Sequence, residues 1–186
     1  DVYKRQIENY PFPAHTESRA MNARIPEDAL PPTLDPKALQ EFVDDKWDNE
    51  IIPALTDYIA VPAKSPAFDA DWEKNAFIER VVRDAAQWVE AQKVSGLKLE
   101  VVRLPGRTPV IFFDAPATRS DNGDTVLLYG HLDKQPEFSG WRAGLGPWTP
   151  KYEDGKLYGR GGADDGYAVY ASLTAIMALD LPLIHI

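Results

Sequence analysis

A change of hydrophobic period near Gly96 constrains the fold of this chain more than any other feature of its sequence. Before this glycine, apolar residues recur at helical spacing over residues 35–61 and again over residues 71–95. After it, the apolar residues alternate with polar ones or form short continuous runs, as strands do. The chain is therefore predicted to place two long helical stretches before a set of strands.

The helical stretches carry their own start and stop signals. Asp35 is a favoured N-cap residue, and Pro36 suits the first helical position, so the first helix is expected to begin there. Pro53 is expected to kink or restart this helix, and Gly96 to end the second one. The buried stripe of the second helix is predicted to consist of Phe77, Val81, Ala85, Trp88 and Val89.

Three strands are predicted over residues 97–104, 109–115 and 125–130, which read LKLEVVRL, PVIFFDA and TVLLYG. A hairpin is expected around the Asp154-Gly155 turn, and a buried helix over residues 167–180. Because the apolar runs are nearly continuous, the sheet is expected to be covered by helices on both faces. The predicted fold class is α/β, with a mixed sheet flanked by helices.

Composition excludes several classes of function. The formal net charge of −9 and the absence of a basic stripe argue against a nucleic-acid partner. No apolar run approaches the ~20 residues that span a bilayer and no signal peptide is apparent, so we expect no membrane partner and a cytoplasmic location. The chain has no cysteine, so any metal ion must be held by His, Asp and Glu side chains.

His131 and Asp133 follow directly after the apolar run TVLLYG. In α/β sheets, ligands gather beyond the carboxyl ends of the strands, so this is where a site would be built. A metal-bound imidazole commonly donates its other ring proton to a carboxylate or carbonyl, and Asp133 is well placed for that role. The alternative is a histidine that only hydrogen-bonds the backbone at the end of a strand.

The segment GRGGADDG, residues 159–166, presents Asp164 and Asp165 on a glycine-rich turn just before the last predicted helix. A carboxylate here could bridge two metal ions. The alternative is a turn with solvated acids near a helix N-terminus, where negative charge is favoured. Its glycine spacing matches neither phosphate-binding motif, and the acids would repel phosphate. The segment also lacks the twelve-residue spacing of the calcium-binding loop in a helix-loop-helix motif, which argues against a calcium site.

Taken together, YGHLD and the later DGKLYGRGGADDG resemble the zinc-dependent exopeptidase family that includes carnosine dipeptidase, acetylornithine deacetylase and succinyl-diaminopimelate desuccinylase. The resemblance implies that His131 is a zinc ligand, that Asp133 is the catalytic carboxylate orienting it, and that Asp164 bridges two zinc ions. It also implies a cis peptide bond between Asp164 and Asp165. The implied cofactors are two Zn²⁺ ions, with Co²⁺ or Mn²⁺ as substitutes.

Two departures from the family pattern qualify this resemblance. Tyr167 stands where family members often have lysine. The adjacent glutamate pair that would supply the general base does not follow Asp164 within this chain. We therefore expect the base, the remaining metal ligands and an inserted dimerisation domain to lie beyond residue 180, and the chain alone to be inactive.

Both ends of the chain are expected to be foreign to the protein. The first six residues, DVYKRQ, are one translation of a transposase-type sequencing adaptor, and the last six, LPLIHI, differ by one residue from a translation of its opposite strand. The expected organisation is a non-native or disordered leader over residues 1–20 and an adaptor-derived tail over 181–186. Residues 21–180 are then the N-terminal part of a zinc aminopeptidase-like catalytic domain.

The function predicted for the complete protein is zinc-dependent hydrolysis of an amide bond in dipeptides or small peptides. An N-acyl amino acid deacylase or desuccinylase is the alternative within the same family. From another class, the chain could be a non-catalytic binding module that has lost its metals. The expected partners are a small peptide or N-acyl amino acid substrate and a second copy of the complete protein.

Overall fold

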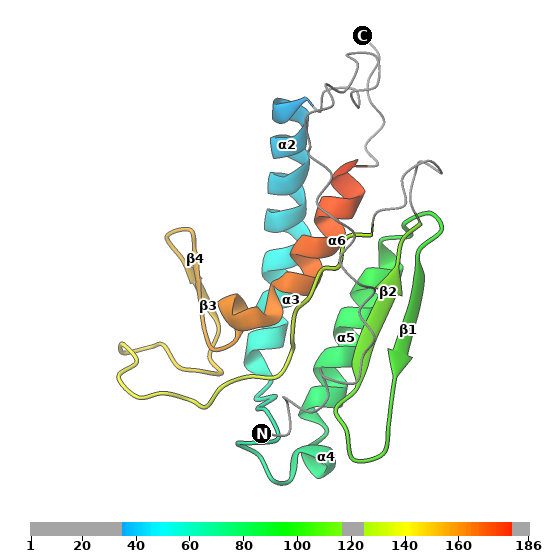
Figure 1. Ribbon diagram of the computed structural model, residues 1–186. Coiled ribbons are helices and arrows are strands. Elements are labelled where there is room, and N and C mark those ends of the chain that lie inside the picture. The colour runs from blue at the N-terminus through cyan, green and yellow to red at the C-terminus, as the bar shows by residue number, and fades with distance from the viewer. Residues whose placement is uncertain (1–34, 117–124, 180–186) are drawn as a thin grey trace, which may run out of the picture. The chain divides into compact units, whose positions relative to one another are not determined.

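The structure is a computed structural model, and it describes residues 35–116 and 125–179. Helices dominate this part of the chain, and its strands pair as two short hairpins (Figure 1). In chain order the elements are α2 (Pro36–Lys46), the π-helical turn η2 (Trp47–Ile51), α3 (Ile52–Ala60), α4 (Trp72–Asn75), α5 (Phe77–Ala91), β1 (Lys98–Val102), β2 (Val110–Asp114), β3 (Lys151–Glu153), β4 (Lys156–Tyr158), η3 (Gly162–Gly166) and α6 (Ala168–Leu179). The α/β class is confirmed.

The first helical stretch begins and restarts where the sequence predicts. The Asp35 carboxylate accepts a hydrogen bond from the backbone N–H of Lys37 at 2.9 Å, which caps α2. Pro53 lies in the first turn of α3, directly after η2. Proline has no N–H to donate to the preceding turn, and the wider η2 turn separates α2 from α3 at this point.

The second helical stretch is divided, which the sequence prediction missed. Ala76 has a φ of 56°, and this left-handed residue separates α4 from α5. Of the predicted stripe on α5, Val81, Ala85 and Val89 are buried, whereas Phe77 and Trp88 are only partly buried. The buried face is wider than predicted because α5 contacts α6 on one side and the β1–β2 hairpin on another.

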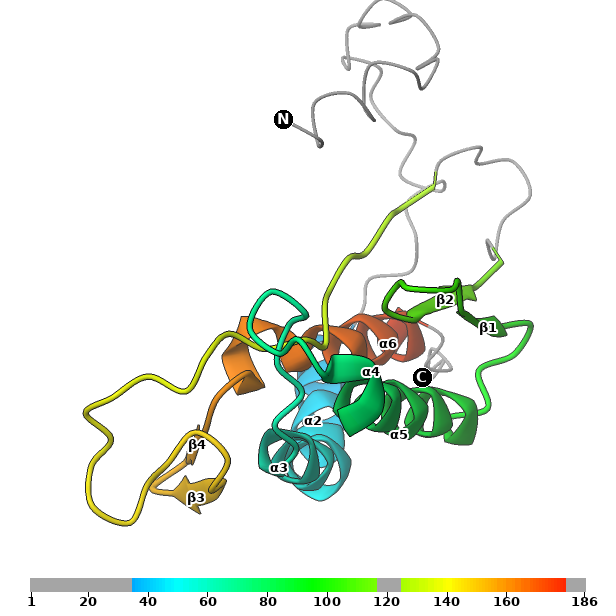
Figure 2. The same cartoon turned by 90° about the horizontal axis from the view of Figure 1, so that it is seen from below.

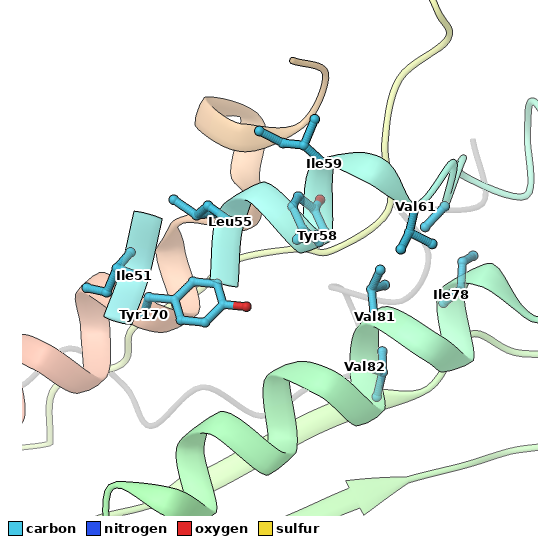
Figure 3. Close-up of a cluster of buried hydrophobic side chains, with 10 residues drawn as sticks. Ile51, Leu55, Tyr58, Ile59, Val61, Ile78, Val81, Val82 and Tyr170 are labelled. Atoms are coloured by element: carbon cyan, nitrogen blue, oxygen red, sulfur yellow. The ribbon is translucent and has the colours of Figure 1, made fainter. Parts of the chain in front are cut away.

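The core of the described residues lies among α3, α5 and α6. Figure 3 shows Leu55 and Tyr58 of α3 in one cluster of buried side chains with Val81 of α5 and Tyr170 of α6. Each fully buried side chain of this size contributes about 1.5–3 kcal/mol through removal of apolar surface from water. The rings of Tyr170 and Trp88 form a T-shaped pair with a centroid distance of 4.9 Å. This core fixes the C-terminal end of α3, against which the candidate site is built.

The two hairpins lie on opposite sides of the helices (Figure 2). β1 and β2 pair antiparallel, and Val101 and Ile111 pack against the core. β3 and β4 are also antiparallel and are joined by the predicted Asp154-Gly155 turn, in which both residues have positive φ. Both sheets are therefore small antiparallel hairpins.

The strand predicted over residues 125–130 is wrong. These residues belong to no described strand and are exposed, with Val126 at 81%, Leu127 at 86% and Tyr129 at 81%. The physical reason is that a strand requires a backbone partner, and no described strand pairs with this segment. The predicted cover on both sheet faces also fails for the described residues, because Val110 and Phe112 of β2 remain more than half exposed.

None of the helices in the described ranges is long and apolar enough to cross a membrane. The expected leader over residues 1–20 and the expected tail over residues 181–186 lie outside the described residues.

Candidate functional site

The segment that carries His131 and Asp133 is attached to the chain directly after α3. The backbone N–H of Lys134 donates to the carbonyl of Ala63 at 2.9 Å, and the N–H of Ser65 donates to the carbonyl of Lys134 at the same distance. These bonds form a short parallel bridge between residues 64 and 134. The segment therefore gains its position from the loop after α3 and not from a neighbouring strand.

Tyr58 of α3 provides a second attachment. Its hydroxyl donates a hydrogen bond to the backbone carbonyl of Leu132 at 3.0 Å. Burial raises the pKa of the Tyr58 hydroxyl far above its ordinary value, and the nearby charges of Asp133, Asp165 and Asp164 add to this effect. The hydroxyl therefore remains a donor across the physiological pH range.

The glycine-rich turn carries the second set of acids to the same place. The N–H of Gly166 donates to the carbonyl of Gly161 at 2.8 Å, and the N–H of Tyr167 donates to the carbonyl of Gly162 at 3.2 Å. The peptide bond between Asp164 and Asp165 is cis, as the family resemblance implied.

Close packing explains two of the glycines around the site. A Cβ at Gly166 would lie 2.2 Å from the Tyr58 ring, and a Cβ at Gly130 would lie 2.5 Å from the Cβ of Ala168. Glycine is required where backbones approach this closely, because any side chain would overlap its neighbour. The glycines thus bring the backbone of the turn against α3, and the backbone before His131 against the start of α6.

His131 lies between the two predicted acids. Its Nδ1 is 3.0 Å from the backbone oxygen of Asp133 and 3.4 Å from the Asp133 carboxylate. Its Nε2 is 3.4 Å from the carboxylate of Asp164. The structure therefore brings together the three site residues predicted from the sequence, although the backbone oxygen of Asp133 is a nearer acceptor than its carboxylate.

These three side chains remain accessible to solvent and solutes. The exposed fraction is 33% for His131, 37% for Asp133 and 60% for Asp164. An imidazole nitrogen and a carboxylate oxygen that face each other from different segments are two donors of the kind that zinc accepts. Within residues 35–116 and 125–179, however, no group of three or more His, Cys, Asp or Glu side chains could hold a metal ion.

Sequence reasoning missed Lys134, which follows Asp133 and is fully buried. Its amino group donates to carbonyls at the C-terminal end of α3. One signal could have suggested such a contact: α3 has no basic residue in its last turn and no glycine directly after it. A helix end without these two features can accept further hydrogen bonds from a side chain elsewhere in the chain.

Comparison with known proteins shows that this chain belongs to a family of peptidases. Residues 127–183 match the model of the family described as Peptidase family M20/M25/M40. The chain is 30% identical to human Beta-Ala-His dipeptidase over 164 residues, which cover 82% of this chain and 31% of that protein. It is 40% identical to succinyl-diaminopimelate desuccinylase of Anaplasma marginale (strain Florida) over 60 residues, covering 32% of this chain and 15% of that protein.

The fold agrees with a solved structure of the same kind. The crystal structure of human carnosine dipeptidase 1 matches with a TM-score of 0.55 and 28% sequence identity, covering 80% of this chain and 31% of that one. The resemblance to this family of peptidases, indicated by the two motifs, is confirmed. The chain spans about a third of the length of the dipeptidases that it matches.

Proposed function

We propose that this chain is part of a metal-dependent hydrolase that cleaves the amide bond of dipeptides or other small peptides. One observation carries the proposal: His131 is held with one ring nitrogen toward Asp133 and the other toward Asp164. The family match over residues 127–183 supports the same assignment, because it covers both motifs.

The two nitrogens of His131 have different environments, which suits a metal ligand. An Nδ1–H that donates to the backbone oxygen of Asp133 leaves Nε2 without a proton, with its lone pair available on the side of Asp164. The Asp133 carboxylate lies on the same side of the ring and also favours the tautomer with its proton on Nδ1. In this proposal Asp133 orients the ring, while His131 and Asp164 bind metal.

The donor set fits part of a zinc centre. A nitrogen and a carboxylate oxygen, without any thiolate, suit Zn²⁺ and also Co²⁺ or Mn²⁺. A catalytic zinc site ordinarily has three protein ligands, so further ligands and a general base are proposed to come from residues outside the described ranges. The bound metal would act as a Lewis acid that polarises the scissile carbonyl. The proposed stoichiometry is two ions per complete protein chain, and His131 and Asp164 would be among their ligands.

A second candidate reaction is removal of an N-acyl or N-succinyl group from an amino acid. The similarity to the desuccinylase, 40% identity over 60 residues, supports it, because Beta-Ala-His dipeptidase of Mus musculus matches over a similar length with nearly the same identity, 42% over 66 residues. Both reactions break an amide bond, so the same metal centre would serve either substrate.

The test uses a protein that contains this chain together with the residues that complete the metal site. We expect two metal ions per chain, fewer in His131→Gln and Asp164→Asn, and hydrolysis that is lost with chelator and restored by Zn²⁺. Asp154→Asn, in the exposed β3–β4 turn, is the matched control and should keep both ions.

A panel of dipeptides and N-acyl amino acids then separates the two reactions. Turnover of N-succinyl or N-acetyl amino acids without any dipeptide turnover would refute the dipeptidase assignment. A folded protein with no stoichiometric metal would refute the hydrolase proposal and leave a non-catalytic binding module.

A further inference from the structure

Lys134 is the largest fully buried side chain among the described residues, with none of its surface exposed. It forms no ion pair with a described carboxylate. Burial lowers the pKa of its amino group to about 7, because the charged form loses its hydration. Burying a lysine without an acidic partner is costly, so its contacts need a specific explanation.

The amino group caps the C-terminal end of α3. Its Nζ donates to the carbonyl of Tyr58 at 2.6 Å and to that of Val61 at 2.7 Å, and it lies 3.4 Å from the carbonyl of Ile59. The last carbonyls of a helix have no partner within the helix, and they form the negative end of its dipole. The same two carbonyls also accept the backbone N–H groups of Val61 and Ala63, at 3.1 and 2.8 Å, so a residue distant in sequence adds a side-chain donor to this local backbone cap.

The rest of the Lys134 side chain contacts the glycine-rich turn. A Cβ at Gly161 would lie 2.8–2.9 Å from three carbons of the lysine stem. Gly161 also has a φ of 87° and accepts the hydrogen bond from the N–H of Gly166 that closes the turn around Asp164. The stem of Lys134 thus packs directly against the backbone that carries the second predicted metal ligand.

The remaining contacts place Lys134 at the junction of three segments. Its backbone pairs with residues 63 and 65, and the Tyr58 ring lies 3.8 Å beneath its Nζ. Asp133 directly precedes Lys134, and the carbonyl of Leu132, one residue earlier, accepts the hydrogen bond from the Tyr58 hydroxyl. The end of α3, the His131–Asp133 segment and the glycine-rich turn therefore meet at this one side chain.

We propose that Lys134 is the positioning residue of the candidate site: its buried amino group, bonded to the carbonyls at the end of α3, holds the segment that carries His131 and Asp133 against the turn that carries Asp164. Its importance for catalysis rests on the hydrolase proposed above. Its positioning role is a property of the described chain and can be tested without activity.

The first test compares Lys134→Met with Lys64→Met in the 186-residue chain by amide hydrogen exchange. Methionine keeps the approximate length of the side chain and removes its donors. Lys64 is the matched control, because it is the partner of Lys134 in the parallel bridge but pairs with Glu137 near the surface.

In Lys134→Met, the amides of Ser65 and Gly166 should accelerate at least tenfold more than those of Val82 and Ala86 in α5. The ring-nitrogen NMR signals of His131 should also shift, whereas Lys64→Met should leave them unchanged. A loss of general stability would accelerate the α5 amides equally, so this comparison separates positioning from a merely structural role.

A second test applies even if Lys134→Met fails to fold. Because the chain has no cysteine, Lys134→Cys can be alkylated at one position in denaturant and then refolded. A 2-aminoethyl group restores the amino group, and a propyl group of the same length does not. We expect native exchange rates at Ser65 and Gly166 only with the aminoethyl group.

Two results would overturn the positioning role. One is equal behaviour of the propyl and aminoethyl proteins. The other is acceleration of Ser65 and Gly166 in Lys134→Met that does not exceed that of α5. If the exchange results hold and the metal-completed protein neither binds metal nor hydrolyses amides, the positioning role stands and the hydrolase proposal alone fails.

Discussion

Two consecutive parts of one stretch of chain, residues 125–129 and residues 131–134, differ in a way that their sequences do not suggest. The first part is apolar, TVLLY, and most of its large side chains are exposed. The second contains a histidine, an aspartate and a lysine, yet Lys134 is fully buried, and its backbone N–H and carbonyl are both hydrogen-bonded to the loop after α3. Among the described residues, the apolar part pairs with no strand, whereas the polar part has several hydrogen-bond partners.

The difference shows that, in this stretch of chain, burial depends more on whether hydrogen-bond partners are present than on whether a side chain is polar. Residues 131–134 meet the C-terminal end of α3, which offers carbonyls as acceptors, and the Tyr58 hydroxyl, which offers a donor. Residues 125–129 meet no described strand that could satisfy their backbone groups. The polar residues 131–134 are thus fixed by hydrogen bonds to the α3 region, whereas the apolar residues 125–129 pair with no described strand.

The largest expected effect tests the tight packing on the polar side of this comparison. Gly166→Ala should lower the free energy of unfolding by about 3 kcal/mol, because the new methyl would lie 2.2 Å from the buried Tyr58 ring. Chemical denaturation measures the change. The comparison variant is Gly144→Ala, which has open space and a φ of 81°, and should cost only about 1 kcal/mol. Equal losses in the two variants would mean that the turn does not pack against α3 as described.

The second prediction concerns the pH dependence that a buried lysine imposes. The pKa of Lys134 is lowered to about 7 in the folded chain, while an unfolded lysine titrates near ~10.4. Between these values the unfolded chain binds more protons, so the free energy of unfolding should rise with pH, by at most about 1.4 kcal/mol per pH unit. Denaturation from pH 7 to 9.5 measures the slope.

Lys134→Met should remove this rise, and Lys64→Met should keep it. Unfolded tyrosine begins to ionise toward pH 9.5, so the raised pKa values of Tyr58 and Tyr170 oppose this rise at the top of the range, and the comparison with Lys134→Met isolates the contribution of the lysine. The same slope in wild type and Lys134→Met would show that the lysine is hydrated in the folded chain.

The smallest expected effect tests the apolar part of the comparison. Leu127→Ser should change the free energy of unfolding of this chain by less than about 0.5 kcal/mol, because Leu127 is 86% exposed. Leu173→Ser, at a fully buried position of α6, should cost roughly 3 kcal/mol or more in the same urea titration. A comparable loss at both positions would show that residues 125–129 are covered in solution.

Much of this molecule could be predicted from the sequence, because the signals are local. Asp35 and Pro36 specify the start of α2, and Asp154-Gly155 specifies a hairpin turn, through hydrogen bonds and dihedral angles within a few residues. The two motifs identified the family and its candidate site residues, and the structure places His131 between Asp133 and Asp164. The metal-binding roles of these residues stay predictions.

Only the tertiary structure decided which of these segments are fixed in position and which residues form the hydrogen bonds that fix them. Nothing near Lys134 in the sequence predicts burial, since its acceptors lie more than 70 residues earlier, at the end of α3. The strand predicted at residues 125–130 failed for the converse reason, because an apolar pattern predicts a strand only if another strand is there to pair with it. Local sequence determined caps, turns and the residues of the candidate site, whereas hydrogen bonds between distant segments determined how that site is held together.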